Sequence, residues 1–422
     1  MSTVKTERYA AYKATGVEWL GEIPSIWQLQ RHKNAFQLIS SRCLNPDYLK
    51  VGLENIEGKT GRFISSDSEF EGDGIQFKRN DILFGKLRPY LAKVYLAEFS
   101  GNAIGDIFVY RSRSKVSPQF AAYLMRSDRY IDVINSSTAG AKMPRASSGF
   151  IADLPVAIPS LNEQIAIAAY LDTKTAQIDS HIDLLSQKAM QYGELKQSLI
   201  SEIVTRGLVK STPMRDSGVE WIGGVPEHWE IKRGKDIFEQ TKNKAGLESS
   251  SYDVLSLTLN GVIKRDLENM RGKIPASFDG YQIANPGDLV LCLFDIDVTP
   301  RIVGYVNNLG IITSAYTVIK GKRMVDMRYF LYYYLEQNRN GSLLANSKTL
   351  RSTMTFDLFS QLLLPVPPLA EQRAIANYLD ERTTKIDQII TTINDQIIKL
   401  KDLRKALIND VVTGKIKVVS EE

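Results

Sequence analysis

Apolar residues recur every seven positions in two long stretches of the chain. One row runs from Leu171 to Leu199 and the other from Leu379 to Leu407, each accompanied by a second apolar row at the intermediate position. This spacing predicts amphipathic helices whose apolar stripe faces another helix. Each helix is expected to hold about 40 residues and to be roughly 60 Å long, at about 1.5 Å per residue.

Start and stop signals delimit both helices. Pro159 precedes the letters SLNE at 160–163, a capping-box pattern, and two prolines at 367–368 precede the second stretch. Gly207 and Gly414 stand where the patterns end. The predicted helices therefore begin near 161 and 369.

The two helices are expected to pair with each other. The linker 207–217 has 11 residues. It reaches at most about 35–40 Å and cannot run back along a helix of roughly 60 Å. The second helix must therefore return toward the start of the first, in an antiparallel pair. The predicted pairing interface consists of Leu171, Ile178, Ile182, Leu185, Leu199, Leu379, Ile386, Ile390, Ile393, Ile397, Leu400 and Leu407.

Two sequence motifs occur once in each half of the chain. GVEWLG at 16–21 recurs as GVEWIG at 218–223, and IPSLNEQIAIAAYLD at 158–172 matches VPPLAEQRAIANYLD at 366–380 at ten of fifteen positions. The middle segments show little identity. Repeated frames with divergent fillings indicate two modules of one architecture with different specificities. The alternative is an old duplication whose halves drifted without purpose.

All four tryptophans lie in the short repeats that open the two modules. At the module entrance they are expected to form a turn that fastens the preceding segment, rather than platforms for stacking bases. The fold class that follows is mixed α/β (α+β). It has two globular modules joined by two long antiparallel helices that form a coiled coil, with approximate two-fold symmetry.

Composition places few limits on the function. The 422 residues include 53 Lys and Arg against 48 Asp and Glu, a net charge of +5, which permits nucleic-acid binding without requiring it. No apolar run approaches the roughly 18 residues that span a membrane. Cys43 and Cys292 fall in different halves and give neither a disulfide framework nor a metal spacing. The expected location is the cytoplasm.

Basic residues gather in two segments of the first module. In segment 77–93 they alternate with aromatic residues, and in segment 140–148 they stand among glycine and serine. Such side chains neutralise phosphates, and an arginine can also donate two hydrogen bonds to guanine. The alternative is a solvated surface. The predicted DNA contacts of this module are Lys78, Arg79, Lys86, Arg88, Lys93, Lys142 and Arg145.

The second module departs from this pattern. When Asp81 is aligned with Asp288, the letters LFDID at 293–297 replace KLRPY at 86–90. The two modules are thus expected to contact different bases. The predicted basic contacts of the second module are Arg301, Lys348 and Arg351.

Carboxylates offer alternatives to a purely DNA-reading chain. Asp295 and Asp297 lie two positions apart, which could suggest magnesium, but a salt bridge or a hydrogen bond from cytosine N4 is the favoured interpretation. The letters PD at 46–47, with Glu57 and Lys59, imitate a nuclease pattern that is too degenerate to carry an assignment. No metal site or catalytic residue is predicted, so a non-enzymatic protein is expected. A coiled-coil scaffold without DNA specificity and a PD-ExK-like nuclease are the alternatives.

The repeated motifs resemble those of a known family. The sequence GVEWLGEIP followed by Trp27, and the pattern P-x-L-x-E-Q-x-x-I-A-x-Y-L-D that opens each long helix, are similar to the specificity subunits of type I restriction–modification enzymes. The resemblance covers nearly the whole chain. Segments 82–90 and 139–145 also look like that family's recognition domains.

The resemblance implies a target-recognition domain at 1–160, a long helix at 161–207, a second target-recognition domain at 208–368, and a second long helix with a C-terminal tail at 369–422. It implies sequence-specific binding of double-stranded DNA at a bipartite, asymmetric site whose gap the helices set. The chain itself would hold no cofactor. Two methyltransferase subunits would carry S-adenosylmethionine, and two motor-nuclease restriction subunits would use ATP and magnesium. No membrane is implied as a partner.

Overall fold

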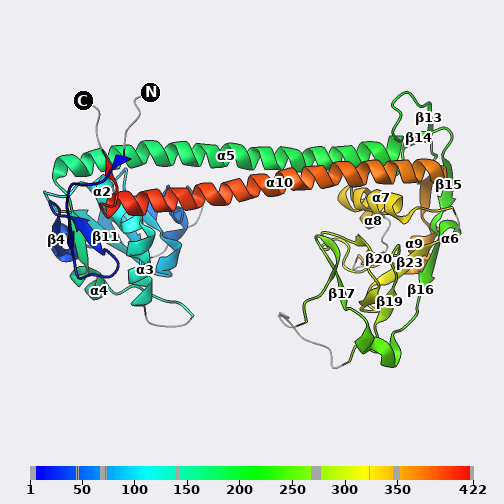
Figure 1. Ribbon diagram of the computed structural model, residues 1–422, viewed down its shortest axis with the longest axis horizontal. Coiled ribbons are helices and arrows are strands. Elements are labelled where there is room, and N and C mark those ends of the chain that lie inside the picture. The colour runs from blue at the N-terminus through cyan, green and yellow to red at the C-terminus, as the bar shows by residue number, and fades with distance from the viewer. Residues whose placement is uncertain are drawn as a thin grey trace. The chain divides into compact units, whose positions relative to one another are not determined.

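The computed structural model describes residues 6–43, 45, 47–66, 72, 74–138, 142–267, 277–322, 324–345 and 352–418. The chain divides into two compact units. The first unit combines Met1–Ser186 with Asn394–Glu422, and the second is Gln187–Ile393. Each unit therefore contains one globular module together with a part of each of the two long helices (Figure 1).

The first unit is built on a four-stranded antiparallel sheet in the order β5-β11-β8-β9. A three-stranded sheet, β6-β10-β7, and the strand pairs β1-β25, β2-β3 and β4-β12 accompany it. The strands are β1 (Thr6–Glu7), β2 (Tyr12–Ala14), β3 (Glu22–Pro24), β4 (Gln28–Arg31), β5 (Phe36–Ile39), β6 (Lys50–Val51), β7 (Ile75–Phe77), β8 (Ile82–Gly85), β9 (Val94–Leu96), β10 (Gly101–Ala103), β11 (Ile107–Ser112), β12 (Pro155–Ile158) and β25 (Lys417–Val418). The helices of this module are α1 (His32–Ala35), α2 (Pro118–Arg126), α3 (Asp128–Ser136) and α4 (Ser148–Asp153), with 3-10 turns η1 (Leu53–Asn55) and η2 (Pro89–Leu91).

The second unit repeats this plan. Its four-stranded antiparallel sheet has the order β16-β23-β20-β21, and the pairs β13-β14, β15-β24, β17-β18 and β19-β22 accompany it. The strands are β13 (Met214–Asp216), β14 (Gly224–Pro226), β15 (Glu230–Arg233), β16 (Phe238–Thr241), β17 (Leu255–Thr258), β18 (Gly261–Lys264), β19 (Gln282–Ala284), β20 (Leu289–Leu291), β21 (Val303–Tyr305), β22 (Gly310–Ile312), β23 (Thr317–Gly321) and β24 (Leu363–Val366). The helices of this module are α6 (Gly234–Ile237), α7 (Met327–Arg339), α8 (Ser342–Ala345) and α9 (Phe356–Gln361), with a 3-10 turn η3 (Gly246–Ser251).

Each four-stranded sheet separates two apolar cores. Along β8, Ile82 and Phe84 belong to one core and Leu83 belongs to another. Along β20, Leu289 and Val290 divide between two cores in the same manner. Successive side chains of a strand point to opposite faces, so a strand that is covered on both faces is apolar at every position. The short apolar runs ILFG and LVL are therefore central strands.

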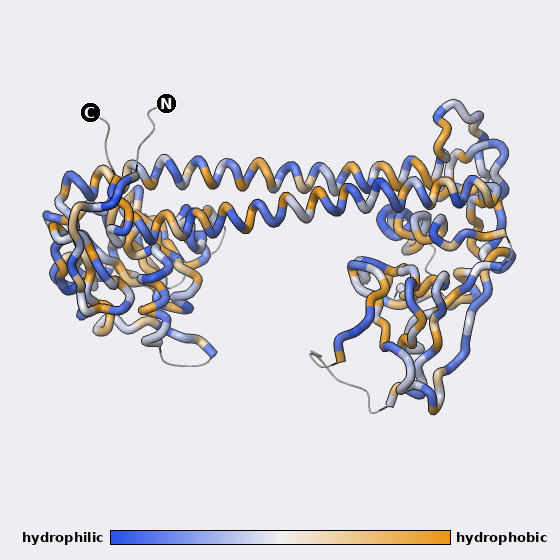
Figure 2. The backbone as a smooth tube through the Cα atoms, viewed as in Figure 1, coloured by the Kyte–Doolittle hydropathy of each residue, from blue (hydrophilic) through white to orange (hydrophobic). Residues whose placement is uncertain are grey.

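Two long helices connect the sequence repeats: α5 (Leu161–Arg206, 46 residues) and α10 (Leu369–Val412, 44 residues). Hydrophobic and hydrophilic residues alternate along both (Figure 2). In the first unit, Ile167 near the start of α5 shares a core with Val411 near the end of α10, and in the second unit Ile203 shares a core with Ile375. The two helices therefore pack antiparallel within each unit. The predicted mixed α/β fold, with two modules and two paired long helices, is confirmed.

The twelve residues predicted to line the helix pair are all buried or half-buried. Five are buried: Leu171, Leu379, Ile386, Ile393 and Ile397. Leu171 and Leu379 lie in the cores of the globular modules. The apolar stripe of each helix thus continues into the module at its end, so helix pairing and module packing share side chains.

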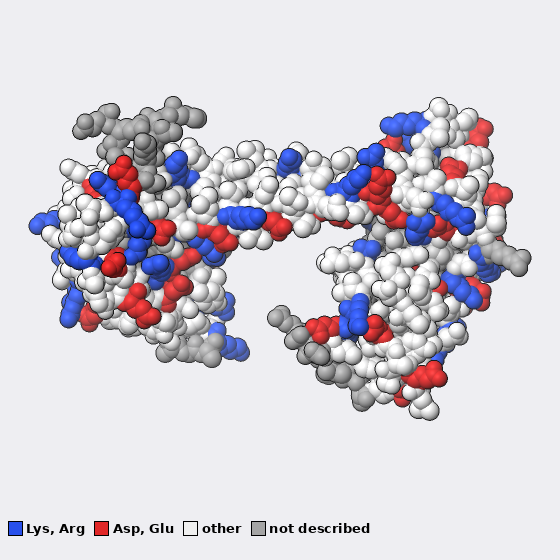
Figure 3. Space-filling view, viewed as in Figure 1, with Lys and Arg blue, Asp and Glu red and all other residues white. Residues whose placement is uncertain are grey.

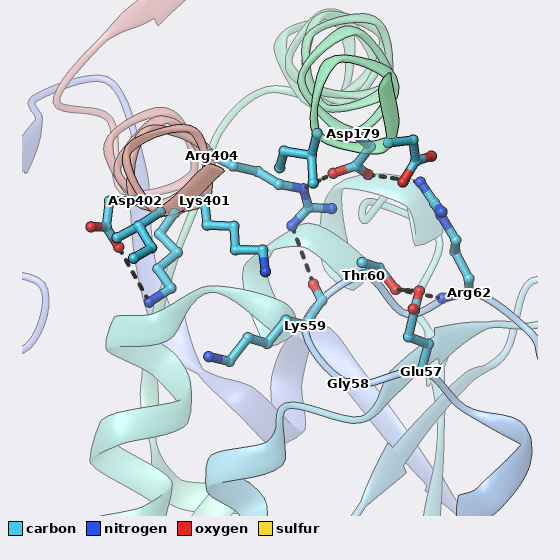
Figure 4. Close-up of a pocket in the computed structure, with 13 residues that line it drawn as sticks. Glu57, Gly58, Lys59, Thr60, Arg62, Asp179, Lys401, Asp402 and Arg404 are labelled. Atoms are coloured by element: carbon cyan, nitrogen blue, oxygen red, sulfur yellow. Dashed lines mark hydrogen bonds and ion pairs between the residues drawn. The ribbon is translucent and has the colours of Figure 1, made fainter. Parts of the chain in front are cut away.

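One position of the apolar row on α10 is an arginine. Arg404 follows Ile397 by seven residues, and its side chain is only 10% exposed. Its Nε lies 3.0 Å from Oδ1 of Asp179 on α5, and its Nη1 donates to the carbonyl of Lys59 at 3.3 Å. Arg62 contacts the same carboxylate at 3.1 Å (Figure 4). The ion pair joins α5, α10 and the loop 57–62 of the first module, around a cavity of about 430 Å³.

The second unit has an ion pair at the equivalent positions of the sequence repeat. Lys196 and Asp387 occupy the positions equivalent to Arg404 and Asp179, and the Lys196 ammonium lies 2.6 Å from Oδ2 of Asp387. This second pair is more exposed, at 30% for the lysine side chain and 56% for the aspartate. Ion pairs at the seam of paired helices fix their register.

The repeated Glu-Gln of the helix motif has a structural explanation. Gln164 is fully buried: its Oε1 accepts the backbone N–H of Ser117 at 2.7 Å, and its Nε2 donates to the carbonyl of Pro159 at 2.9 Å. Gln372 binds Asp326 and the carbonyl of Pro367 in the same manner, both at 2.8 Å. A buried amide needs such partners. The glutamine therefore fastens the helix start to the segment before α2 or α7.

One tryptophan from each short repeat is buried at the start of its module. Trp27 is 1% exposed and donates through Nε1 to Glu163 at 3.1 Å, and Trp229 is equally buried. Neither side chain is available to stack on a base. At the end of α10, Gly414 has φ +73°, and a Cβ there would lie 2.3 Å from Cδ of Pro24. Only glycine fits between this helix end and the module.

None of the helices in the described part of the chain combines the length and the apolar character that crossing a lipid bilayer requires.

Replacing Arg404 with Ala should destabilise the protein far more than replacing Lys196 with Ala. The first change leaves Asp179, 14% exposed, with Arg62 as its remaining ion-pair partner. We expect a loss of about 2–4 kcal/mol in the free energy of unfolding for Arg404→Ala and at most about 1 kcal/mol for Lys196→Ala. Urea unfolding measures both, and equal losses would contradict the structural role assigned to Arg404.

His32 should make the stability of the first unit sensitive to acid. Its ring is 1% exposed and packs between Phe36 and Tyr110, and burial lowers the pKa of His32 to about 3. The unfolded chain takes up this proton below about pH 6.5 while the folded chain does not. The stabilising contribution is therefore complete above pH 6.5 and is lost as the pH falls toward 3, by at most about 1.4 kcal/mol per pH unit.

Urea unfolding between pH 4 and 8 checks this expectation. His32→Leu should show a flatter pH dependence than the wild type. His181→Leu, a change at an exposed position of α5, is the matched control and should run parallel to the wild type. Parallel curves for all three proteins would contradict the role of His32.

Candidate nucleic-acid interface

Four of the predicted basic residues come from two loops that the first unit joins. One loop follows β8 and the other precedes α4. The backbone N–H of Arg88 donates to the carbonyl of Pro144, and that of Ala146 donates to the carbonyl of Lys86, both at 2.8 Å. Leu87 and Arg145 form a β-bridge. We call Lys86, Arg88, Lys142 and Arg145 the basic cluster.

An acidic residue, Asp106, lies beside the basic cluster, directly before β11. Asp106 accepts hydrogen bonds from Arg145 through both carboxylate oxygens, at 3.2 Å from Nε and 3.0 Å from Nη2. The Lys86 ammonium lies 3.6 Å from the same carboxylate and 5.4 Å from the centre of the Phe108 ring. The hydrogen bond from Arg145 and the neighbouring positive charges lower the pKa of Asp106. Asp106 is therefore ionised and holds two basic side chains in place.

Sequence reasoning missed Asp106. It occurs as a single acid in the segment GNAIGDIF, and the equivalent residue of the second module is Ala315, so the repeat gives no signal for it. A search for positively charged residues also does not select a carboxylate. Its role depends on a contact between residues 39 positions apart in the chain.

Arg88 stands at the most strained point of the cluster. Its backbone has φ +51°, in the left-handed region, and its side chain is exposed. Asp295 in the corresponding loop of the second unit has φ +48°. A residue other than glycine costs about 1–2 kcal/mol in this conformation. Both modules therefore keep the same unfavourable loop shape with opposite charges at its tip, which is typical of functional loops.

The other predicted contacts of the first module lie outside this cluster. Lys78 and Arg79 are exposed in the turn that precedes β8, and the four residues of β8 separate that turn from Lys86. Lys93 donates through its ammonium to the carbonyl of Leu53 at 2.6 Å. Lys93 thus stabilises the fold. Its carbonyl accepts the N–H of Gly85 at 2.8 Å, so its backbone lies beside the loop after β8, while its ammonium is engaged by Leu53.

Arg301 is engaged by the second module itself. Its Nε donates to the carbonyl of Val303 and its Nη1 to the carbonyl of Leu259, both at 2.9 Å, and burial lowers the pKa of Arg301. The side chain thus fastens the turn between β17 and β18 to β21. Lys348 and Arg351 lie outside the described residues.

The second unit has a cavity of mixed lining where the first has its basic cluster. The loop 293–297 again meets the segment before a short helix: the N–H of Met354 donates to the carbonyl of Leu293 at 2.7 Å. Leu293 replaces Lys86 and Ala315 replaces Asp106. A cavity of about 360 Å³ opens there. Its lining includes one basic and one acidic residue, Lys242 and Asp357, beside Gln240, Phe294 and Thr355.

Asp295 and Asp297 are exposed. Over the described ranges, no cluster of three His, Cys, Asp or Glu residues is arranged to hold a metal ion. In the nuclease-like pattern, the Glu57 carboxylate accepts a hydrogen bond from the Thr60 hydroxyl (Figure 4), and Pro46 lies outside the described residues. The geometry around Glu57 gives the nuclease alternative no support.

Charge on the surface is finely divided. On the face drawn in Figure 3, the Lys and Arg side chains of the first unit lie among Asp and Glu. A face with this distribution attracts a polyanion only weakly. Binding to nucleic acid would therefore depend on local groups such as the basic cluster.

Two modules with the same four-stranded sheet and different chemistry at equivalent loops define a duplicated protein whose halves have diverged. The sequence comparisons make this class more specific. Residues 226–399 match the family model described as the type I restriction modification DNA specificity domain. Over this part the chain is similar to the specificity subunits of type I restriction–modification enzymes, and the resemblance seen in the sequence is confirmed.

Individual relatives agree with this placement. The chain is 25% identical over 191 residues to the type I restriction enzyme EcoDI specificity subunit of Escherichia coli, an alignment that spans only 42% of that protein. It is 20% identical to the EcoBI specificity subunit of Escherichia coli, over 88% of this chain and 87% of that one. A solved chain from a study of assembly and conformational transition of the type I R-M system superposes with a TM-score of 0.69 at 17% identity, covering 92% of this chain and 98% of that chain, which shows a shared fold.

Proposed function

We propose that this chain binds double-stranded DNA in a sequence-specific manner as the specificity subunit of a type I restriction–modification complex. One observation carries the proposal. The two units share a four-stranded sheet topology and a loop pair, yet the first places a basic cluster there and the second a cavity of mixed lining, without the lysines and arginines of that cluster. A shared frame with different contact chemistry suits two readers of two different half-sites.

The target is accordingly bipartite and asymmetric. Lysine and arginine in the basic cluster supply phosphate neutralisation, and exposed guanidinium groups supply hydrogen-bond donors for base edges. In the second unit, Gln240 offers an amide of the kind that pairs with adenine, in a cavity that Phe294 also lines. Each module would therefore recognise its own short sequence.

We further propose that catalysis resides in partner subunits. Two methyltransferase subunits would bring S-adenosylmethionine, and two restriction subunits would bring ATP-driven movement and magnesium-dependent cleavage. The chain would position these partners on the site without a cofactor of its own. The similarity to specificity subunits supports this division.

DNA binding should be steeply salt-dependent and should lose part of that dependence in a double variant. Arg88→Gln with Lys142→Ala removes two exposed positive charges of the basic cluster. If both contact phosphates, the slope of log K against log salt should shrink by about 1.8, or about 0.9 for each contact. Fluorescence anisotropy with duplex DNA at graded salt measures the slope.

Lys33→Ala is the matched control, because Lys33 lies on the same module and is already paired with Asp153 at 2.7 Å. It should leave the slope nearly unchanged. Binding to partner proteins without any affinity for duplex DNA would instead favour the coiled-coil scaffold.

The purified chain without partners should transfer no methyl group to DNA and cut no DNA. Assays with S-adenosylmethionine, and separately with magnesium, check both activities. Cleavage that disappears in Glu57→Gln and Lys59→Ala would establish the nuclease alternative.

A further inference from the structure

We propose that Asp106 orients Arg145 so that the first module reads a guanine. Asp106 is a positioning residue, and Arg145 makes the base contact. The inference rests on the proposed function, because it assigns one base-reading contact within it. It concerns the first unit alone.

The contact between the two side chains leaves the reading edge of the arginine open. Asp106 takes one N–H from Nε and one from Nη2, which is the side edge of the guanidinium. A guanidinium carries five N–H groups in one plane. The two at the outer end, on Nη1 and Nη2, point away from the carboxylate. That pair matches the O6 and N7 acceptors of guanine.

The surroundings make the arrangement rigid yet accessible. The Arg145 backbone is bridged to Leu87, and the neighbouring N–H of Ala146 is bonded to Lys86. The Arg145 side chain is 53% exposed, whereas Asp106 is 23% exposed. The backbone of Arg145 and one edge of its guanidinium are thus held in place before DNA binds. Pre-organisation of this kind sharpens discrimination, because less freedom is lost on binding.

A carboxylate at a DNA-binding surface requires an explanation, because it repels phosphates. The negative charge of Asp106 is offset by the positive charges of Arg145 and Lys86 together. A surface selected only for phosphate affinity would gain from an uncharged residue at this position. An acid that holds one arginine in a fixed plane serves base recognition instead.

The second unit cannot form this reader at the equivalent loops. Ala315 stands in place of Asp106, and Leu293 in place of Lys86. We therefore expect a guanine that is contacted by an arginine held by a carboxylate in one half-site only. That half-site is the one bound by the first unit.

The test selects binding sites from a randomised duplex library with the full-length wild-type chain and its variants. The wild type should select a site with a guanine required at one position of one half-site. Asp106→Asn should reduce the preference for that guanine about tenfold, and affinity for unrelated DNA should stay equal or rise. Arg145→Lys keeps the charge but not the paired donors, and should abolish the same preference without changing the salt slope.

Asp153→Asn is the matched control. Asp153 is another carboxylate of the first module that holds two basic residues, Arg31 and Lys33, and it is 61% exposed. This variant should select the wild-type site. Thermal unfolding of every variant confirms that the first unit is intact.

Two results would overturn the inference while leaving the proposed function standing. In one, Asp106→Asn raises affinity for all sequences equally, so that Asp106 only repels phosphate. In the other, Arg145→Lys and Asp106→Asn select the wild-type site unchanged. A wild-type chain that selects no site at all would instead refute the proposed function, and the inference with it.

Discussion

The pairing of α5 with α10 is the constraint on which the rest of the structure depends. A helix of more than forty residues with one apolar stripe is not stable in water unless another surface covers that stripe. Within each unit the covering surface is the other long helix, and the same side chains run on into the module core. Each module therefore continues the apolar core of the helix segments in its own unit.

The parts of this architecture that depend on periodicity could be predicted from the sequence. The heptad rows, the prolines before each helix and the doubled motifs led to two long antiparallel helices and two like modules. The motif Glu-Gln was recognised as a helix start, but its meaning needed the structure. Gln164 and Gln372 are buried amides that bind backbone groups in segments before α2 and α7, a relation that local pattern does not contain.

The candidate site could be predicted only in part, for a physical reason. A charge run shows which residues are basic but not which of them are already engaged. Lys93 and Arg301 donate to backbone carbonyls of their own modules, while Arg88 and Arg145 come together through a loop contact between distant segments. Asp106 escaped notice because its function lies in the geometry of another side chain. Its importance comes from pairing, and pairing is decided by the fold.

The composition of the first unit also has a consequence for how the protein is made. The second unit is one continuous segment, whereas the first needs residues from both ends of the chain: Ile408 and Val411 belong to its core, and β25 pairs with β1. During synthesis the first module leaves the ribosome early, but its core is completed only when the last turns of α10 emerge. The module that is translated second can therefore finish folding first. Until then the open core of the first module is the surface that the cell must keep from aggregating.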